Sequence, residues 1–466
     1  MPEKCISRRE ALLAVGAAIA VPGMADAASA RPMEVIRLKP QVRYQQLEGW
    51  GVSLAWWAHV VGAFPERIRR HYMDCIFNPV RGLGLTVVRY NIGGGENPKY
   101  HFIQYRAAVP GFSPRPGVFN WHADKGQITI LRQAMAMGAT RTEAFCNSPP
   151  YYMTQSGSVT GAVGGGDNLR QEAQTAFANY LAVVAAHFRR NLNIRFQTLE
   201  AFNEPVSHWW KFGNYQEGCH IGDKQQNILI PLLASAIKSH GLNASIAAPD
   251  DNSIDETLRS WRSYSPRTRA LIYQINTHSY NGSDRAALRN AAAQAGKHLW
   301  MSEYGDGDAT GMQMARRILQ DMRELRPAAW VYWQAVDSAR GWGFMFNPLN
   351  GSATEFNIHD KYHVMAAFSR FFRPGCRFIF SSSADTLAAI DERQRTVTVA
   401  LLNDDHHERR FTLDLTPIGS GRWHAEIYQF TVGENPLRQT RLIGAERHIH
   451  LALPPRSVYT IQVSRG

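Results

Sequence analysis

The stretch TLEAFNEP, residues 198–205, has the pattern of a buried β-strand that ends on a carboxylate, Glu204. The stretch HLWMSEYG, residues 298–305, repeats this pattern and carries Glu303 at the corresponding place. Charged acids are rarely buried inside a sheet, so both glutamates are expected where their strands end. The two stretches therefore predict a pair of parallel strands that bring acids to one edge of a sheet.

Strand-like and helix-like segments alternate on both sides of these stretches, from residue 48 to residue 372. The alternation is typical of a parallel sheet with helical connections. Eight such units favour a (β/α)8 TIM barrel over a doubly wound sheet, because no Gly-x-Gly-x-x-Gly follows the first strand. The expected strands are residues 48–53, 85–91, 140–146, 196–203, 243–248, 271–277, 298–303 and 328–334, and the clearest helices are residues 173–190, 225–240, 286–295, 312–325 and 361–372.

After residue 372 the helical segments give way to short β-like runs separated by turn residues. This pattern predicts a side β-sandwich over residues 373–466. Residues 31–47 are also strand-like, and we expect them to join the same side domain. The C-terminal runs are residues 376–381, 396–402, 411–415, 424–430, 448–453 and 458–463.

Residues 1–30 are expected to be a twin-arginine signal peptide. The motif SRREALL, residues 7–13, is followed by an apolar stretch and by small residues that offer cleavage after Ala27 or Ala30. The apolar stretch is too short to span a bilayer, and no later segment reaches that length. We therefore expect a periplasmic or secreted protein without an integral membrane segment in its mature chain.

The composition is that of an ordinary globular protein, with 44% hydrophobic and 19% charged residues. The net charge is +12, but the arginines are dispersed, so nucleic acid is not an expected partner. We expect a monomer that needs no cofactor or metal. The mature cysteines match no zinc-binding spacing, and their disulfide pairing stays open; they are Cys75, Cys146, Cys219 and Cys376.

Active sites of such barrels lie at the carboxyl ends of the strands. Glu204 ends the fourth expected strand and Glu303 the seventh, and two facing acids are what cleavage of a glycosidic bond requires. Other acids near strand ends have simpler interpretations. Asp250 and Asp251 are interpreted as a helix N-cap and a loop, and Asp337 as a solvated loop acid.

Several motifs occur in a characteristic order along the chain. The central one is Asn203-Glu204-Pro205, followed by Glu303. The others are LEGWGVSL (47–54), RYNIGGG (89–95), NSPPYYM (147–153) and FSRFFRPG (368–375). Together they resemble glycoside hydrolase family 30, and within it the endo-β-1,6-galactanase branch. The resemblance covers nearly the whole mature chain and implies the barrel with its side sandwich.

The resemblance implies a retaining hydrolase that cleaves β-1,6-galactosidic linkages of galactan or arabinogalactan side chains. Glu204 would be the acid/base and Glu303 the nucleophile. Arg89 would hold Glu303 as a carboxylate, and Asn203 would hydrogen-bond the sugar 2-hydroxyl.

Further side chains complete the expected site. His278 and Tyr280, at the end of the sixth strand, would orient the nucleophile. Aromatic rings and one amide near strand ends would contact a poly- or oligosaccharide. These substrate-binding candidates are Trp333, Trp56, Trp57, Asn147, Tyr152 and Trp209.

The sugar itself stays open at this stage. The same mechanism could act on β-1,6-glucan, glucuronoxylan or a β-fucoside. A protein that only binds carbohydrate is a further alternative, although such proteins typically lose one acid and both acids are present here. Endo and exo action are not distinguished by these motifs.

Overall fold

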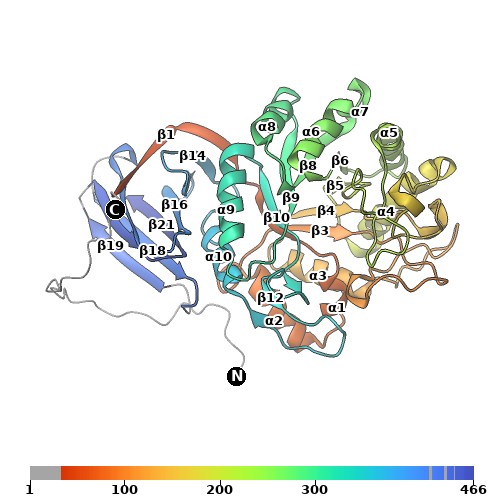
Figure 1. Ribbon diagram of the computed structural model, residues 1–466, viewed down its shortest axis with the longest axis horizontal. Coiled ribbons are helices and arrows are strands. Elements are labelled where there is room, and N and C mark those ends of the chain that lie inside the picture. The colour runs from red at the N-terminus through yellow and green to blue at the C-terminus, as the bar shows by residue number, and fades with distance from the viewer. Residues whose placement is uncertain (1–32, 419–421, 435–437, 445–446, 466) are drawn as a thin grey trace.

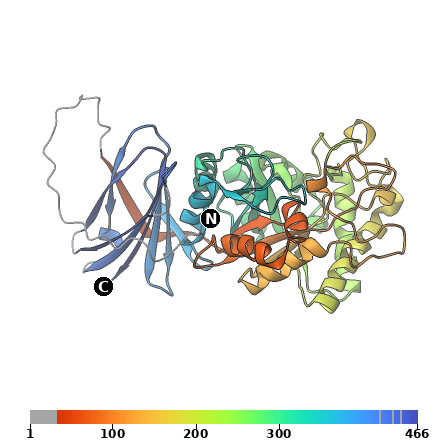
Figure 2. The same ribbon diagram turned by 90° about the horizontal axis from the view of Figure 1, so that it is seen from below.

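The computed structural model describes residues 33–418, 422–434, 438–444 and 447–465. A β domain lies at one side of a larger α/β barrel, as two perpendicular views show (Figures 1 and 2). The expected signal peptide, residues 1–30, falls outside the described residues. Within the described ranges, no helix has the length and apolar character needed to cross a membrane.

The larger body is a closed barrel of eight parallel strands. Their order is β6–β5–β4–β3–β2–β10–β9–β8, and pairing of β6 with β8 closes the ring. The predicted (β/α)8 fold is therefore confirmed. The barrel strands are β2 Gly49–Ser53, β3 Val87–Asn91, β4 Arg141–Phe145, β5 Thr198–Leu199, β6 Ser245–Ala247, β8 Ile272–Asn281, β9 His298–Tyr304 and β10 Ala329–Tyr332.

Helices surround the barrel and bury apolar faces against it; α10, Asp360–Ser369, which also packs against the β domain, is buried along most of its length. Three of the helices begin at side-chain caps: Asp124 accepts a hydrogen bond from the Gln127 amide, Ser253 from the Glu256 amide and Ser265 from the Thr268 amide. The α-helices are α1 Trp57–Val61, α2 Glu66–Phe77, α3 Lys125–Ala136, α4 Gln174–Leu192, α5 Asp223–Ser239, α6 Ile254–Ser263, α7 Pro266–Leu271, α8 Arg285–Gln294, α9 Met312–Gln320 and α10 Asp360–Ser369. Shorter helical turns are η1 Tyr105–Ala107, η2 Tyr151–Met153, η3 Val163–Gly165, η4 Gln171–Ala173, the π-helical η5 Asp321–Leu325 and η6 Thr416–Ile418.

Four short strands add to the barrel at its carboxyl edge. β7, Asp251–Ser253, pairs with β8 beyond the closed ring. β11 Val336–Asp337, β12 Met345–Phe346 and β13 Asn357–Ile358 form a small sheet after β10. None of these was predicted, because strands of two or three residues are too short to show a period in sequence.

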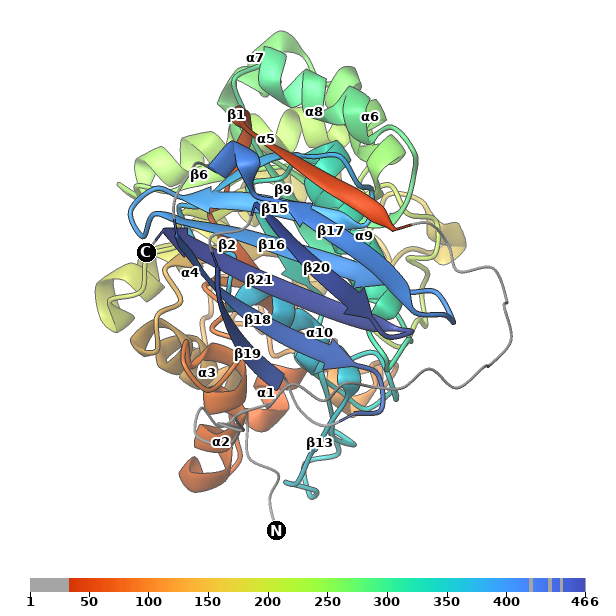
Figure 3. The ribbon, with the colours of Figure 1, turned by 90° about the vertical axis from the view of Figure 1, so that its left-hand side faces the viewer.

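The β domain is a nine-stranded sheet that curls over its own apolar core. Its order is β19–β18–β21–β16–β15–β14–β1–β17–β20. Strand β1, Glu34–Gln46, pairs antiparallel with β14 and parallel with β17, so the N-terminal strand lies among the C-terminal ones (Figure 3). The remaining strands are β14 Arg377–Ser381, β15 Thr386–Asp391, β16 Thr396–Asn403, β17 Arg409–Asp414, β18 Trp423–Thr431, β19 Arg438–Gly444, β20 His448–Leu453 and β21 Ser457–Arg465.

The barrel and the β domain share one apolar core. Trp50 of β2, Phe372 after α10 and Leu402 of β16 belong to the same cluster of buried side chains. The indole Nε1 of Trp50 donates to the Phe372 carbonyl at 2.8 Å. Outside this cluster, Arg316 of α9 forms ion pairs with two β-domain carboxylates, Asp385 and Asp404. Apolar packing and charge thus both hold the two bodies together.

Candidate active site

A cavity of about 320 Å³ opens at the carboxyl ends of the barrel strands. Its walls come from the loops that follow β2, β3, β4, β5 and β10 and from the carboxyl ends of β8 and β9. Both predicted acids, Glu204 and Glu303, line it, and both are buried. The other side chains that line it are Trp56, Arg106, Asn147, Asn203, Trp210, Tyr215, Gln216, Glu217, Tyr280, Trp333, Asp337, Ala339 and Trp342.

Glu204 lies on a tightly bent segment after the two-residue strand β5. Its backbone has φ of 49°, in the left-handed region that residues with a side chain rarely adopt. The Glu204 amide donates to the Asp250 carbonyl at 2.9 Å, and its carbonyl accepts from Trp210 Nε1 at 2.9 Å. These bonds hold a strained backbone that turns the carboxylate into the cavity.

Glu303 extends from β9, and each of its oxygens meets a different partner. The Tyr280 hydroxyl donates to Oε1 at 3.0 Å. The Arg89 guanidinium donates to Oε2 through Nη1 at 3.4 Å. Both donors favour the ionised carboxylate.

His278 lies between the two acids. Its Nδ1 is 3.2 Å from Glu204 Oε1 and 3.6 Å from Glu303 Oε1. Although burial disfavours a charged imidazole, the carboxylates of Glu303 and Asp250 raise the pKa of His278 well above its usual value. A positively charged ring therefore sits between the acids. Asn252 Nδ2 is the second donor to Glu204 Oε1, at 2.7 Å.

The separation of the acids bears directly on mechanism. One carboxylate oxygen of Glu204, one of Glu303 and one nitrogen of His278 all lie within 4.8 Å of one another. Carboxyls about 5–5.5 Å apart are typical of retaining glycosidases, and a wider gap is typical of inverting ones. Among the described residues these three side chains also form the one group close enough to share a metal ion. A protonated His278 offers a donor and no lone pair at Nδ1, which favours hydrogen bonding over ligation.

Arg89 lies at the centre of a buried charge cluster beneath the cavity. Its guanidinium contacts Glu143 at 2.8 Å and Glu200 at 3.0 Å, and also reaches Asp250. Its contact with Glu303, at 3.4 Å, is the longest of the four. Arg89 therefore does more than hold Glu303, because it also pairs with three further acids in the barrel interior.

The interpretation of Asp250 as part of a helix cap and loop was wrong. Asp250 is fully buried, and the true N-cap of α6 is Ser253. Burial alone would favour the neutral acid, but the charges of Arg89 and His278 lower the pKa of Asp250. Asp250 thus joins the two cations, and Ser302 donates to its Oδ1. Asp250 and Arg89 are far apart in sequence and meet only in the closed barrel, so the sequence alone did not indicate this role.

Burial raises the pKa of Glu303 to about 7. The positive charge of His278 opposes this rise, and the negative charge of Glu204 adds to it. Two carboxyls this close do not titrate independently. Near neutral pH the site is thus poised between states that differ by one proton.

The side walls carry groups suited to a sugar. Trp333 and Trp56 meet edge to face, with ring centroids 5.2 Å apart. The buried Oδ1 of Asn203 has no hydrogen-bond partner among the described residues and is free to accept from a hydroxyl. Asn147 also lines the cavity, as expected. Flat apolar rings beside unpaired polar atoms are the usual composition of a saccharide site.

Three predicted substrate contacts do not line the cavity. Trp57 is fully buried, and its indole donates to the Ser53 carbonyl, so its assignment to the substrate was wrong. Tyr152 is bonded to the Ser113 hydroxyl at 2.7 Å. Trp209 is 44% exposed and is not among the residues that line the cavity, while its neighbour Trp210 is.

An ion pair at the cavity wall was missed. Asp337, interpreted as a solvated acid, is buried and accepts from Arg106 Nη1 at 3.1 Å. The Arg106 guanidinium also lies 4.8 Å from the ring of Trp56. Arg106 belongs to the short turn η1, which no periodic pattern marks, so only the folded loop brings it to the site.

Comparison with known proteins places the chain in a family. The family model described as O-Glycosyl hydrolase family 30 matches residues 33–290. An endo-beta-1,6-galactanase of Hypocrea rufa is 35% identical over 408 residues, which cover 83% of this chain and 84% of that protein. An exo-beta-1,6-galactobiohydrolase of Bifidobacterium longum subsp. longum is 25% identical, over 90% of this chain and 38% of that protein.

Solved structures share the fold. A conserved exported protein from Bacteroides fragilis superposes with a TM-score of 0.79 at 21% identity, covering 92% of this chain and all of that one. The catalytic domain of GH30 xylanase C from Talaromyces cellulolyticus superposes with a TM-score of 0.73, also at 21% identity, covering 92% of this chain and all of that one. With the family match, these results lead to one conclusion: the chain is a glycoside hydrolase and belongs to glycoside hydrolase family 30.

Proposed function

We propose that this enzyme cleaves β-1,6-galactosidic linkages with retention of configuration at the anomeric carbon. The observation that carries the mechanism is the close approach of Glu204 and Glu303, whose nearest ligand oxygens lie within 4.8 Å. The linkage is supported by two relatives, an endo-beta-1,6-galactanase and an exo-beta-1,6-galactobiohydrolase.

In the first step Glu303 attacks the anomeric carbon and forms a covalent glycosyl ester. Glu204 donates its proton to the glycosidic oxygen, and the bond between that oxygen and the anomeric carbon breaks. The attack needs ionised Glu303, and the positive charges of His278 and Arg89 favour that state. Positive groups fixed beside the nucleophile thus offset the cost of burying it.

In the second step Glu204 acts as a base. It removes a proton from water, the hydroxide oxygen bonds to the anomeric carbon, and the ester bond to Glu303 breaks. The unpaired Oδ1 of Asn203 accepts from the 2-hydroxyl during both displacements. Both acids then return to their starting states.

Azide rescue distinguishes the two roles. Glu303→Ala and Glu204→Ala are expected to lose most of their activity toward an aryl β-galactoside with a good leaving group. With sodium azide, Glu303→Ala should yield the α-galactosyl azide and Glu204→Ala the β-galactosyl azide, because azide replaces the nucleophile in one variant and water in the other. The opposite pairing of products would reverse the two assignments.

A polysaccharide panel tests the linkage. We expect release of β-1,6-galacto-oligosaccharides from β-1,6-galactan and little product from β-1,6-glucan, glucuronoxylan or an aryl β-fucoside. Cleavage of xylan or glucan without cleavage of galactan would refute the galactan assignment. The size of the first products also separates endo from exo action.

We also infer export through the twin-arginine route, on the strength of the SRREALL motif. Replacing Arg8 and Arg9 together by lysine should keep the enzyme in the cytoplasm of the producing cell. Cell fractionation followed by immunoblotting measures this. Unchanged delivery of the double variant outside the inner membrane would argue for another route.

A further inference from the structure

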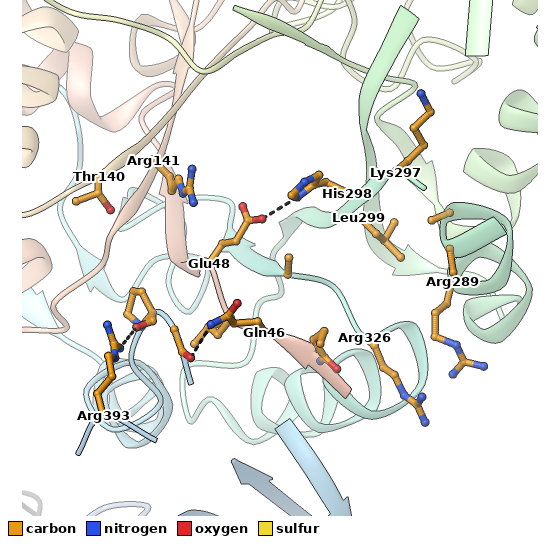
Figure 4. Close-up of a pocket in the computed structure, with 17 residues that line it drawn as sticks. Gln46, Glu48, Thr140, Arg141, Arg289, Lys297, His298, Leu299, Arg326 and Arg393 are labelled. Carbon is orange, nitrogen blue, oxygen red and sulfur yellow. Dashed lines mark hydrogen bonds and ion pairs between the residues drawn. The ribbon is translucent and has the colours of Figure 1, made fainter. Parts of the chain in front are cut away.

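A second cavity, of about 720 Å³, lies at the opposite end of the barrel from Glu204 and Glu303. Its wall includes residues at the amino ends of barrel strands, such as Arg141 of β4 and His298 of β9. Helix α8 and the segment that leads into the β domain complete it (Figure 4). The cavity therefore lies where the bottom of the barrel meets the β domain.

Cationic side chains surround this cavity (Figure 4). Arg393 has a carboxylate partner, Asp391, at 3.5 Å. The other four have no acid within ion-pair distance in the described part of the chain. The cations of the lining are Arg141, Arg289, Lys297, Arg326 and Arg393.

The lining contains a single acid, Glu48, and its carboxylate is already engaged. Oε1 lies 2.8 Å from His298 Nδ1, and Oε2 accepts from Trp300 Nε1 at 3.1 Å. Burial opposes ionisation of Glu48, but His298 and Arg141 lower its pKa overall. The cavity thus keeps an excess of positive charge.

The cations also act on one another. Burial lowers the pKa of Arg326, and the nearby charges of Arg289 and Arg323 lower it further. This repulsion is relieved when a negative group lies between the guanidinium groups. An anion of the right size would therefore bind here more favourably than at an isolated surface arginine.

The remaining lining suits a hydroxylated molecule rather than a bare ion. The buried Oε1 of Gln45 has no hydrogen-bond partner among the described residues. Thr140 adds a hydroxyl, and Leu299 and Pro374 add apolar surface. Guanidinium groups bind carboxylates through paired hydrogen bonds, and the volume falls within the range of small-molecule sites.

We propose that this cavity is a second saccharide site, which binds an acidic oligosaccharide through its uronate carboxylates. The site holds a charged part of a glycan at the bottom of the barrel while the cleft at the top cleaves a neutral part. Binding at this site depends on charge and shape at the barrel bottom and is independent of the proposed cleavage reaction.

Isothermal titration calorimetry of the full chain tests the site. The ligands are digalacturonate, neutral galactobiose, galactose 1-phosphate and inorganic phosphate, each in low-salt buffer at neutral pH. We expect saturable binding of one digalacturonate, which weakens as salt screens the charges. Equal affinity for inorganic phosphate would show a simple anion site, and equal affinity for galactobiose would show a site that ignores charge; either result overturns the proposal.

Variants locate the binding. Arg289→Gln combined with Arg326→Gln should weaken digalacturonate binding at least tenfold. Arg141→Gln, where the guanidinium has no hydrogen-bond partner among the described residues, should weaken it severalfold without affecting folding. Arg132→Gln, on the exposed face of α3, is the matched control and should bind like the parent enzyme.

The three variants should hydrolyse a neutral aryl β-galactoside at the same rate as the parent enzyme. Digalacturonate binding that is absent, or that survives in both cavity variants, would overturn the second site. Failure of the enzyme to cleave galactan would leave this binding result intact, so the two proposals can fail separately.

Discussion

At the scale of single residues, His278 controls the charge balance of the site. It approaches Glu204 and Glu303 through one nitrogen and Asp250 through the other, at 3.3 Å. Its positive charge lowers the pKa of Glu303, which burial raises. The acidity of the nucleophile is thus set by a neighbour that need not touch the substrate.

Replacing His278 by Asn removes that charge, so the pKa of Glu303 should rise. The nucleophile then ionises only at higher pH, and the acidic limb of kcat/KM should move upward by about one pH unit. We expect the maximal kcat/KM to fall about 10- to 100-fold. Tyr280→Phe is the matched variant, because it removes a neutral hydrogen bond and should move the limb less. If the acidic limb of kcat/KM lies at the same pH in His278→Asn and in the parent enzyme, His278 does not have this role.

Asp251 offers a test of stability against pH. Burial raises its pKa to about 7, above the ordinary value of about 3.9. A group that binds its proton more tightly in the folded state adds to the free energy of unfolding. This added stability is fully present below about pH 4 and is lost as the pH rises through about 7. Asp251→Asn should therefore lose less stability than the parent between pH 5 and pH 8, by on the order of 2–4 kcal/mol.

Urea unfolding at the two pH values measures the difference. Glu172→Gln, at an exposed position, is the control and should follow the parent enzyme. If the free energy of unfolding falls by the same amount in Asp251→Asn and in the parent enzyme, Asp251 does not couple folding to protonation.

The sequence located those site residues whose position in a strand is enough to place them. Glu204, Asn203 and Glu303 follow apolar runs, and strand counting puts them at one mouth. Asp250 and Arg106 could not be placed in this way. Their partners, Arg89 and Asp337, lie far along the chain, and only the closed barrel and its loops bring them together.

At the scale of elements, the eight barrel strands were predictable because their buried runs alternate with amphipathic helices. Their bounds agree within a few residues, except at β5, which spans only Thr198–Leu199. In the β domain, β15 and β19 were missed and the other strands of the domain were found. The hydrophobic periodicity of the sequence predicts helices and strands. It does not predict the local backbone bends that determine where a side chain points.

Asp321, in the π-helical turn after α9, joins three other elements. Its oxygens accept from Arg285 of α8 at 2.9 Å, from Ser279 of β8 at 2.8 Å and from Trp330 of β10 at 3.1 Å. Asp321→Ala leaves the buried Arg285 without its carboxylate partner, so the free energy of unfolding should fall by about 3–5 kcal/mol. Arg70→Gln, in an exposed pair with Glu66 on α2, should have no measurable effect in the same urea titration. Similar midpoints for the two variants would refute the structural role of Asp321.

At the scale of the whole molecule, the barrel and the β domain are not independent. The apolar cluster that fills the barrel continues through Phe372 into β16 and β21. Helix α10 packs against the same sheet, where the Thr460 hydroxyl donates to the Ala367 carbonyl at 2.6 Å. A boundary drawn at residue 372 therefore passes through a shared core.

This continuity predicts one cooperative thermal transition. Phe372→Ala should lower its midpoint, with a loss of about 3–5 kcal/mol, and should leave a single transition. Val163→Ala, at an 82% exposed side chain, is the control and should match the parent. Differential scanning calorimetry that resolves two transitions in the parent enzyme would contradict the shared core.

The position of β1 has a consequence for synthesis. β1 leaves the ribosome before any barrel strand, yet its partners β14 and β17 are made near the end, and the bond from the Arg37 amide to the Ser382 hydroxyl joins residues 345 apart. Contacts so distant in sequence form late in folding. A stalled nascent chain cannot complete the side domain, so the cell obtains this enzyme only after translation of the whole chain.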